Sequence, residues 1–248
     1  GGKNAIIVTA TADLDEAVSG VIASAFDHSG QKCSAASRVI VQDDVYDEFV
    51  AKLVDAAASL PVAPARNPAA RLIPLINEEA RERVLGYVRR GGEWGKVLLD
   101  GSKIETGDPD LLGPTIVADV DPASELAQKE IFGPVLAVIR GGTELSGMID
   151  IANGTRYALT GGIFTRSPSE RELAMNEFRV GNLYINQKIT GARIGVQPFG
   201  GFQSSGVGSK TGGPDYLLQF MTTNGEEGKE WLGRIGEGYR QEVRWGKL

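Results

Sequence analysis

Residues 5–8 read Ala-Ile-Ile-Val and residues 38–42 read Arg-Val-Ile-Val-Gln, and the stretch from one to the other decides the fold. The two short apolar runs predict buried strands. Between them, Asp13 and Glu16 have the spacing of a capping box that opens a helix. Apolar residues then recur every three or four positions over residues 18–25, which is one face of a helix. The order strand, helix, strand indicates an α/β protein.

The rest of the chain continues this alternation. Further helices are expected over residues 46–57, 78–90, 145–152 and 169–178, and further strands over residues 96–100, 115–117, 135–139, 162–165 and 182–186. Strands that alternate with helices in this way predict a layered α/β fold, a largely parallel sheet with flanking helices.

Composition and charge exclude several classes of function. The chain has 248 residues, enough for one or two domains, with 26 basic and 32 acidic residues and a net charge of −6. A nucleic-acid-binding protein normally has a basic excess, so no nucleic acid is expected as a partner. With one Cys and one His, the chain can form no internal disulfide and no Cys/His zinc site, so no metal is expected.

No membrane or targeting segment is visible in the sequence. No apolar run approaches the roughly 20 residues of a membrane span, and no signal-peptide pattern is present. The lack of disulfides is compatible with a reducing compartment, so a cytoplasmic location is expected, or the mitochondrial matrix in a eukaryote. The chain opens at Gly1 without an initiator Met, which suggests a fragment or a processed product.

Cys33 is the candidate nucleophile. It lies in Gly30-Gln-Lys-Cys-Ser-Ala35, between the first helix and the second strand. Lys32 places a cation beside the sulfur, and a nearby cation favours the nucleophilic thiolate. His28 offers a different chemistry, that of a cysteine hydrolase in which it acts as the base. The alternative without function is a small buried side chain, because many lone cysteines pack in this way.

A glycine-rich segment is the second candidate. Residues 191–213 contain eight glycines and few apolar runs. Successive backbone N–H groups in such a loop can form a nest that binds an anion. A flexible hairpin explains the same composition, and the residues alone do not decide between the two.

Four motifs resemble the aldehyde dehydrogenase superfamily in their order and spacing. They are Gly1-Gly-Lys-Asn4, Gly30-Gln-Lys-Cys33, Glu130-Ile-Phe-Gly-Pro134 and Pro198-Phe-Gly-Gly201. The resemblance implies that residues 1–220 form the cysteine-bearing catalytic domain of such an enzyme, which the cofactor domain precedes in the family. Residues 221–248 do not resemble the usual ending of the family, and no role is predicted for this tail.

Within the superfamily the chain resembles the glutamate-semialdehyde dehydrogenases, also called Δ1-pyrroline-5-carboxylate dehydrogenases, which perform the last oxidation of proline breakdown. Residues 33–35, 186–192, 198–206 and 210–217 carry this resemblance. It implies that Ser34 and the backbone amides of Gly212 and Gly213 bind the α-carboxylate of a small aldehyde substrate. It also implies that Phe220 lines the aldehyde pocket, with Phe202 as a further candidate.

The resemblance also implies a mechanism. The Cys33 thiolate attacks the aldehyde carbon, the Cys33 backbone N–H stabilises the oxyanion, a hydride passes to NAD+, and water hydrolyses the resulting thioester. Glu130 is implied to bind the nicotinamide ribose and Phe132 to pack beside the nicotinamide. The cofactor is expected to be NAD, with NADP as the alternative.

In the family, the general-base glutamate lies two residues before the segment that matches Gly1-Gly2, and the cofactor domain lies further upstream. The 248-residue chain by itself is therefore expected to be inactive, and the full-length form is expected to be a homo-oligomer. Two alternatives stay open: a dehydrogenase for another semialdehyde, and a truncated, non-catalytic binding or assembly module.

Overall fold

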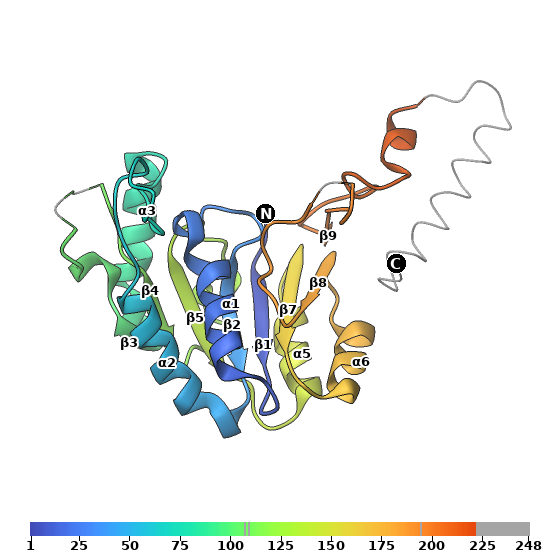
Figure 1. The fold of residues 1–248 in the computed structure, drawn as a ribbon, viewed down its shortest axis with the longest axis horizontal. Coiled ribbons are helices and arrows are strands. Elements are labelled where there is room, and N and C mark those ends of the chain that lie inside the picture. Colours follow the sequence, from blue (N-terminus) through green and yellow to red (C-terminus); the bar gives the residue numbers. More distant parts are fainter. Residues whose placement is uncertain (107, 109, 194, 222–248) are drawn as a thin grey trace, which may run out of the picture.

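A seven-stranded sheet forms the centre of the protein in a computed structural model, which describes residues 1–106, 108, 110–193 and 195–221 (Figure 1). The strand order is β3-β4-β5-β2-β1-β7-β8. Every neighbouring pair is parallel except β3 and β4, which confirms the largely parallel α/β sheet. The strands are β1 (Asn4–Val8), β2 (Ala36–Val41), β3 (Lys96–Leu99), β4 (Thr115–Ala118), β5 (Val135–Arg140), β7 (Thr160–Phe164) and β8 (Asn182–Ile185).

Helices cover both faces of the sheet, because alternate side chains of each strand point to opposite faces. Ile6 and Val8 pack with α1 (Leu14–Phe26) and α2 (Tyr46–Ala58) in one core. Ala5 and Ile7 pack in a second core on the other face. The second core includes buried residues of α3 (Glu78–Arg89), α4 (Glu125–Gln128), α5 (Leu145–Asn153) and α6 (Pro168–Glu177).

Helix α1 ends where the sequence indicates, but the turn after it has a special backbone. Asp13 caps the helix, and its carboxylate accepts from the N–H groups of Asp15 and Glu16. Shortly after the helix, three successive residues have positive φ: 58° at His28, 55° at Ser29 and 68° at Gly30. This left-handed region favours glycine, so the non-glycine residues need outside support. Ser29 has it: its Oγ donates to the carbonyl of Ile73 at 2.6 Å and accepts from the N–H of Ile73 at 2.8 Å.

A few short elements are absent from the expectations drawn from sequence. Helix α4 is one of them. Another is a two-stranded antiparallel pair, β6 (Tyr157–Ala158) with β9 (Phe202–Gln203). Short 3-10 turns complete the structure at Asp27–Gly30, Asp43–Val45, Gly91–Glu93, Gly101–Lys103 and Tyr216–Phe220.

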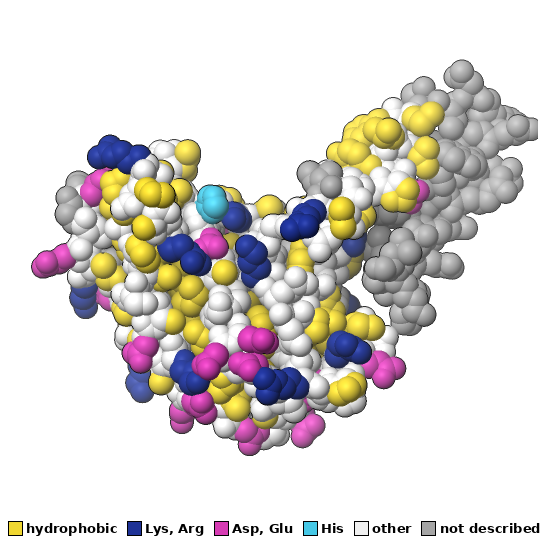
Figure 2. All heavy atoms as spheres, in the orientation of Figure 1, with side chains coloured by type: hydrophobic (Ala, Val, Ile, Leu, Met, Phe, Trp, Pro, Cys, Tyr) yellow, Lys and Arg dark blue, Asp and Glu magenta, His cyan; other side chains and the backbone are white. Residues whose placement is uncertain are grey.

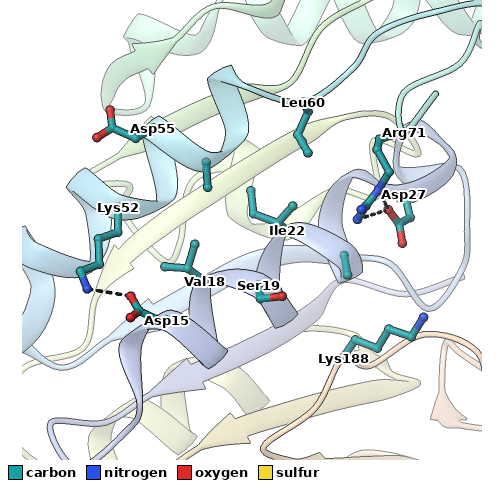
Figure 3. Close-up of a pocket in the computed structure, with 12 residues that line it drawn as sticks. Asp15, Val18, Ser19, Ile22, Asp27, Lys52, Asp55, Leu60, Arg71 and Lys188 are labelled. Atoms are coloured by element: carbon teal, nitrogen blue, oxygen red, sulfur yellow. Dashed lines mark hydrogen bonds and ion pairs between the residues drawn. The ribbon is translucent and has the colours of Figure 1, made fainter. Parts of the chain in front are cut away.

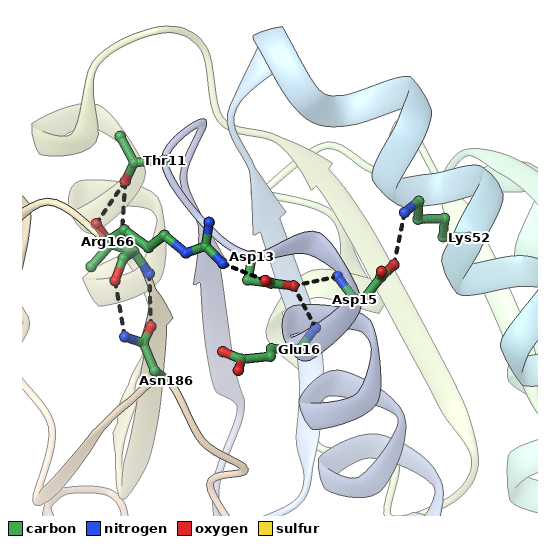
Figure 4. Close-up of polar contacts among 8 residues, drawn as sticks. Thr11, Asp13, Asp15, Glu16, Lys52, Arg166 and Asn186 are labelled. Atoms are coloured by element: carbon green, nitrogen blue, oxygen red, sulfur yellow. Dashed lines mark hydrogen bonds and ion pairs between the residues drawn. The ribbon is translucent and has the colours of Figure 1, made fainter.

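The carboxyl edge of the sheet, where the parallel strands end, is closed by its own hydrogen bonds (Figure 4). Asn186 and Thr165 exchange two hydrogen bonds, at 2.9 Å each. Arg166 forms an ion pair with Asp13 at the start of α1. The hydroxyls of Thr9 and Thr11 both donate to Glu170. Open α/β sheets usually bind ligands at this edge, but here its polar groups are occupied with one another.

After β8 the chain returns along α1 to the opposite edge of the sheet. The N–H of Ile189 donates to the Oγ of Ser24 in α1 at 3.0 Å, and the Ile189 side chain is fully buried. The chain then forms the glycine arm, defined as residues 198–221, which Figure 1 shows leaving the sheet beside the N-terminus. The predicted tail, apart from Met221, lies outside the described residues. Within the described part of the chain, no helix has the length and apolar character to cross a membrane.

Candidate active site

Four of the predicted site residues, Cys33, Ser34, Glu130 and Phe132, lie at the amino edge of the sheet, where the parallel strands begin. Gly1 to Lys3 precede β1, Cys33 and Ser34 precede β2, and Glu130 and Phe132 precede β5. Strands β5, β2 and β1 are adjacent and parallel, so these segments lie side by side. Three short loops therefore bring residues separated by about a hundred positions to one place.

The side chain of Asn4, the first residue of β1, holds the Cys33 loop in place through hydrogen bonds. This side chain is 3% exposed, and its Nδ2 donates to the carbonyls of Cys33 at 2.8 Å and Ala35 at 2.7 Å. Its Oδ1 accepts from the N–H of Thr160 at 3.1 Å. The Thr160 hydroxyl in turn donates to the carbonyl of Ser34 at 3.1 Å. The loop is thus tied to β1 and β7 through its main-chain carbonyls, which leaves the Cys33 side chain exposed.

Two glycines allow the loops to approach each other closely. A Cβ on Gly30 would lie 2.4 Å from the carbonyl oxygen of Gly133, and a Cβ on Gly2 would lie 2.5 Å from that of Cys33. The N–H of Gly2 also donates to Oε1 of Glu130 at 2.8 Å. The spacing between the three loops therefore has no room for side chains at these positions.

The Cys33 loop presents unused polar groups. Among the described residues, the backbone N–H groups of Cys33 and Ser34 and the Ser34 hydroxyl have no hydrogen-bond partner. His28 is exposed, and its side chain makes no hydrogen bond to Cys33 within the described structure. The arrangement provides a thiol beside free donors, and it does not provide the paired Cys and His of a cysteine hydrolase.

A small cleft between the Cys33 loop and the Glu130 segment contains both predicted cofactor residues. It measures about 20 Å³, and Glu130, Phe132, Lys32 and Ser37 are among the residues that line it. Phe132 is 40% exposed and has a φ of 58°, an unfavourable conformation for this residue type that holds the ring at the rim. The Ser37 Oγ is buried and finds no partner among the residues described. This space holds about one water molecule, so the roles of Glu130 and Phe132 toward a nicotinamide riboside stay predictions.

The glycine arm carries the other predicted substrate residues. Phe199 and Thr211 pair through two backbone hydrogen bonds of 2.9 Å, which holds the start of the Gly212–Gly213 loop beside residues 198–200. The N–H of Gly213 already donates to the carbonyl of Lys210 at 2.9 Å, whereas that of Gly212 has no partner in the described structure.

The two predicted aromatic residues lie in different parts of the arm. Phe202 belongs to β9, which pairs with β6 beside the sheet. Phe220 ends the 3-10 turn Tyr216–Phe220 near the end of the arm. It is 68% exposed, and its ring packs edge-on against Tyr216, with the ring centroids 5.3 Å apart. The roles of Phe202 and Phe220 in an aldehyde pocket stay predictions.

Two buried cations lie beneath the amino edge. Arg38 and Lys3 are each 1% exposed. Arg38 donates to the carbonyls of Lys3, Ile151 and Ala152 at 2.8–3.0 Å, so it closes the C-terminal end of α5, where a cation is favourable. The Lys3 Nζ has no hydrogen-bond partner among the described residues. Burial, aided by the Arg38 charge and opposed by Glu130, lowers the pKa of Lys3 to about 7.

The lowered pKa of Lys3 predicts a pH dependence of stability. From pH 7 to pH 9, the free energy of unfolding should rise by about 2 kcal/mol more in the wild type than in Lys3→Met. In this range the unfolded chain keeps a proton on Lys3, whose ordinary pKa is 10.5, while the native chain releases it, so higher pH favours the native state. Urea unfolding at pH 7, 8 and 9 measures the difference, and parallel curves for the two proteins would contradict it.

Another groove of the described structure lies elsewhere and contains none of the predicted site residues. It measures about 770 Å³ and follows the outer face of α1 and α2, where the ion pairs Lys52–Asp15 and Arg71–Asp27 border it (Figure 3). Cys33 and the residues of the four motifs lie outside this groove, so we place the candidate site at the amino edge. Figure 2 supports this choice, because Lys and Arg side chains surround His28 near the amino edge, whereas most acidic side chains of that face lie toward the opposite edge.

Sequence reasoning missed the residues that support the site. The sequence places Asn4 in a motif and Arg38 in a strand, and it predicts no further role for either residue. A polar residue at the start of an apolar strand is the signal that could have pointed to each of them, because a buried polar side chain needs partners.

Comparison with known proteins agrees with this geometry. Residues 1–224 match the sequence model described as the Aldehyde dehydrogenase family. The 1-pyrroline-5-carboxylate dehydrogenase of Bacillus subtilis is 45% identical over 221 residues, which cover 89% of this chain and 42% of the relative. A crystal structure of 1-pyrroline-5-carboxylate dehydrogenase from Thermus with bound NAD is 44% identical, covers 90% of this chain and 42% of that one, and has a TM-score of 0.85.

A longer relative shows the same similarity. The structure of proline utilization A from Bdellovibrio bacteriovorus inactivated by N-propargylglycine is 55% identical, with a TM-score of 0.85, over 90% of this chain and 23% of that chain. The chain thus spans less than half the length of these relatives. The matched family model and the shared fold lead to one conclusion: the chain belongs to the aldehyde dehydrogenase family.

Proposed function

We propose that this chain is the cysteine-bearing catalytic domain, residues 1–220, of an NAD-dependent dehydrogenase that oxidises L-glutamate γ-semialdehyde to glutamate. The observation that carries the proposal is the exposed Cys33 thiol at the amino edge, in a loop whose Cys33 and Ser34 N–H groups are free within the described structure. The substrate class follows from the similarity to 1-pyrroline-5-carboxylate dehydrogenases. The whole enzyme is proposed to be a homo-oligomer of the cytoplasm, or of the mitochondrial matrix in a eukaryote.

The first chemical step uses groups of this chain. The Cys33 thiolate donates an electron pair to the aldehyde carbon, and the carbonyl π electrons move to oxygen, which gives a thiohemiacetal oxyanion. The free Cys33 N–H is placed to donate to that oxyanion. Asn4 contributes by holding the Cys33 carbonyl, which keeps the peptide groups of the loop in one orientation.

Oxidation leaves a thioester on Cys33 when the hydride of the thiohemiacetal carbon departs. The bound NAD+ supplies the hydride acceptor. Glu130 and Phe132 would hold its ribose and nicotinamide, because they line the cleft next to the Cys33 loop. Water then adds to the thioester carbonyl, glutamate leaves, and the thiolate is restored.

Substrate recognition is proposed to depend on the carboxylate. The free hydroxyl and N–H of Ser34 and the Gly212–Gly213 loop offer neutral donors for it, and Phe220 is proposed to line the aldehyde pocket. A hydroxyl and amides bind a carboxylate without requiring a buried ion pair.

Kinetics with a panel of aldehydes tests this function. The assay requires the full-length gene product, because residues 1–248 alone are expected to form no NADH. With NAD+, the full-length protein should show a higher kcat/KM for L-glutamate γ-semialdehyde than for aldehydes of similar length without a carboxylate. Cys33→Ser should lower kcat at least about 10³-fold, because the alcohol is a far weaker nucleophile than the thiolate.

The control for this prediction is Ser59→Ala, a hydroxyl that donates to the Ala56 carbonyl on the surface at the end of α2 and should leave the kinetics unchanged. A full-length protein that treats all the aldehydes alike would refute the substrate assignment and favour another semialdehyde. Full activity in Cys33→Ser would refute the mechanism.

A further inference from the structure

Lys210 lies in the glycine arm, directly before Thr211 and the two glycines of the proposed carboxylate site. Its Nζ donates to the carbonyl of Gly181, the residue before β8. Lys210 also packs closely on Gly200. A Cβ added to Gly200 would lie 3.3 Å from the Cα of Lys210 and 3.2 Å from its Cγ. The Lys210 side chain therefore passes over Gly200, and its Nζ binds the main chain at the amino edge of the sheet, just before β8.

The backbone around Lys210 is attached to the same edge. The Asn182 Nδ2 donates to the carbonyl of Pro198 at 3.0 Å, and its Oδ1 accepts from the N–H of Gly200 at 3.4 Å. A Cβ on Gly181 would lie only 1.8 Å from the Gly200 carbonyl oxygen, so the two segments are in direct contact. The Phe199–Thr211 pair then joins this strand to the glycine loop. The first part of the arm is thus held in place.

A series of contacts connects this region to the Cys33 loop. The N–H of Asn182 donates to the carbonyl of Leu159 at 3.0 Å. The next residue, Thr160, donates through its hydroxyl to the carbonyl of Ser34. The glycine loop and the Cys33 loop are therefore built on the same strand ends, those of β7 and β8.

Lys210 carries a charge that no described group neutralises. It is half-buried, and no carboxylate of the described residues lies within ion-pair distance of its Nζ. Burial lowers the pKa of Lys210, which shows that the cation is poorly solvated where it lies. A neutral carbonyl is its described partner, so an anion that entered beside it would be stabilised.

A positive charge would strengthen the anion site that the loop offers. Two adjacent N–H groups would make a stronger anion nest than one, but the Gly213 N–H is occupied by the Lys210 carbonyl. That leaves the Gly212 N–H as the free donor of the pair within the described structure. A single amide is a weak site for an ion, because charge-assisted hydrogen bonds are about twice as strong as neutral ones.

We infer that Lys210 positions the glycine loop on the sheet and supplies the fixed positive charge of the subsite for the substrate carboxylate. The inference rests on the proposed function, in which this loop faces the carboxylate of the aldehyde. It adds a positioning residue that also determines specificity for an anionic substrate. Lys210 takes no part in bond making at Cys33.

Alkylation of Cys33 tests the charge without requiring turnover. Cys33 is the single cysteine of the chain and is exposed, so it reports alone in the 248-residue protein. The rate constants for anionic iodoacetate and neutral iodoacetamide are measured by mass spectrometry. Their ratio cancels the thiolate fraction, which both reagents share. Glutarate, a dicarboxylate of the substrate's length, is added as a competitor.

Lys210→Met and Lys210→Gln should each lower the ratio of iodoacetate to iodoacetamide rates about three- to five-fold and weaken protection by glutarate. Lys210→Arg should keep the wild-type ratio. The matched control is Lys188→Met, which removes one cation from the segment that returns along α1 and should leave the ratio unchanged. Thermal unfolding establishes that each variant is folded before its rates are compared.

The outcomes separate this inference from the proposed function. If glutarate protects the wild type and both neutral variants keep its ratio, Lys210 has no such role, while the carboxylate subsite stands. If Lys210→Gln alone behaves as the wild type, the hydrogen bond matters and the charge does not, which overturns the inference. Glutarate could also fail to protect Cys33 of the wild type from alkylation and leave the ratio of iodoacetate to iodoacetamide rates unchanged. That result would refute the carboxylate subsite itself, and the role of Lys210 with it.

Discussion

Replacing Arg38 by methionine should lower the free energy of unfolding by about 3–5 kcal/mol. The guanidinium is buried and makes four hydrogen bonds to main-chain carbonyls, two of them to the Lys3 oxygen. Methionine fills a similar volume but donates nothing, so the carbonyls of Lys3, Ile151 and Ala152 would be left buried without these donors. Burial lowers the pKa of Arg38 only to about 10, so the charge that interacts with the end of α5 is present at neutral pH.

Urea unfolding followed by circular dichroism measures the effect of Arg38→Met. Arg166→Met is the matched control, because Arg166 forms an exposed ion pair with Asp13 and should contribute less than about 1 kcal/mol. A loss below 1 kcal/mol in Arg38→Met would mean that the carbonyls find other partners, and that Arg38 does not hold the amino edge together.

Replacing Asn4 by alanine should have the second-largest effect, a loss of about 2–4 kcal/mol together with release of the Cys33 loop. The amide makes three hydrogen bonds, to the carbonyls of Cys33 and Ala35 and from the N–H of Thr160. Alanine removes all three and leaves a space under the loop. The Asn4 bond orients the Cys33–Ser34 peptide group, so the Ser34 N–H would lose its fixed direction, and the adjacent Cys33 N–H would lose the support of this peptide group.

Hydrogen exchange of the backbone amides at residues 32–36, together with urea unfolding, tests the Asn4 prediction. Asn153→Ala is the control, since the Asn153 amide also bridges two main-chain groups, the Glu177 carbonyl and the Arg179 N–H. Asn153 is the last residue of α5 and lies far from Cys33 in sequence. Exchange of the Ala35 amide, which donates to the Lys32 carbonyl at 3.0 Å, should accelerate in Asn4→Ala alone. Equal acceleration in both variants would indicate a general loss of stability, with no specific support of the loop by Asn4.

The main elements of the fold were predictable because they obey simple periodicities. The apolar runs at 5–8 and 38–42 became β1 and β2, and the capping residue Asp13 begins α1 as expected. Buried strands and amphipathic helices have hydrophobic patterns that extend over several residues. The position of Cys33 just before β2 follows from the same patterns, so the sequence also predicts the edge of the sheet at which it lies.

The attachment of the glycine arm was not predictable in the same way. Strands β6 and β9 have two residues each and lie more than 40 positions apart, so neither shows a periodic pattern. The arm is attached by single contacts, such as Lys210 with Gly181 and Asn182 with Pro198, which depend on the folded sheet. The burial of Lys3 was equally unpredictable, because lysine side chains are usually exposed.

Trapping the covalent intermediate tests the central claim most directly, because the claim is that Cys33 carries the substrate. The full-length gene product is mixed with NAD+ and L-glutamate γ-semialdehyde, quenched in acid within one turnover, and digested for mass spectrometry. The account predicts that the peptide containing Cys33 gains one γ-glutamyl group, and that no peptide of the Cys33→Ser protein does. NADH formation in a single turnover with Cys33 unmodified, or with the γ-glutamyl group on another residue, would contradict it.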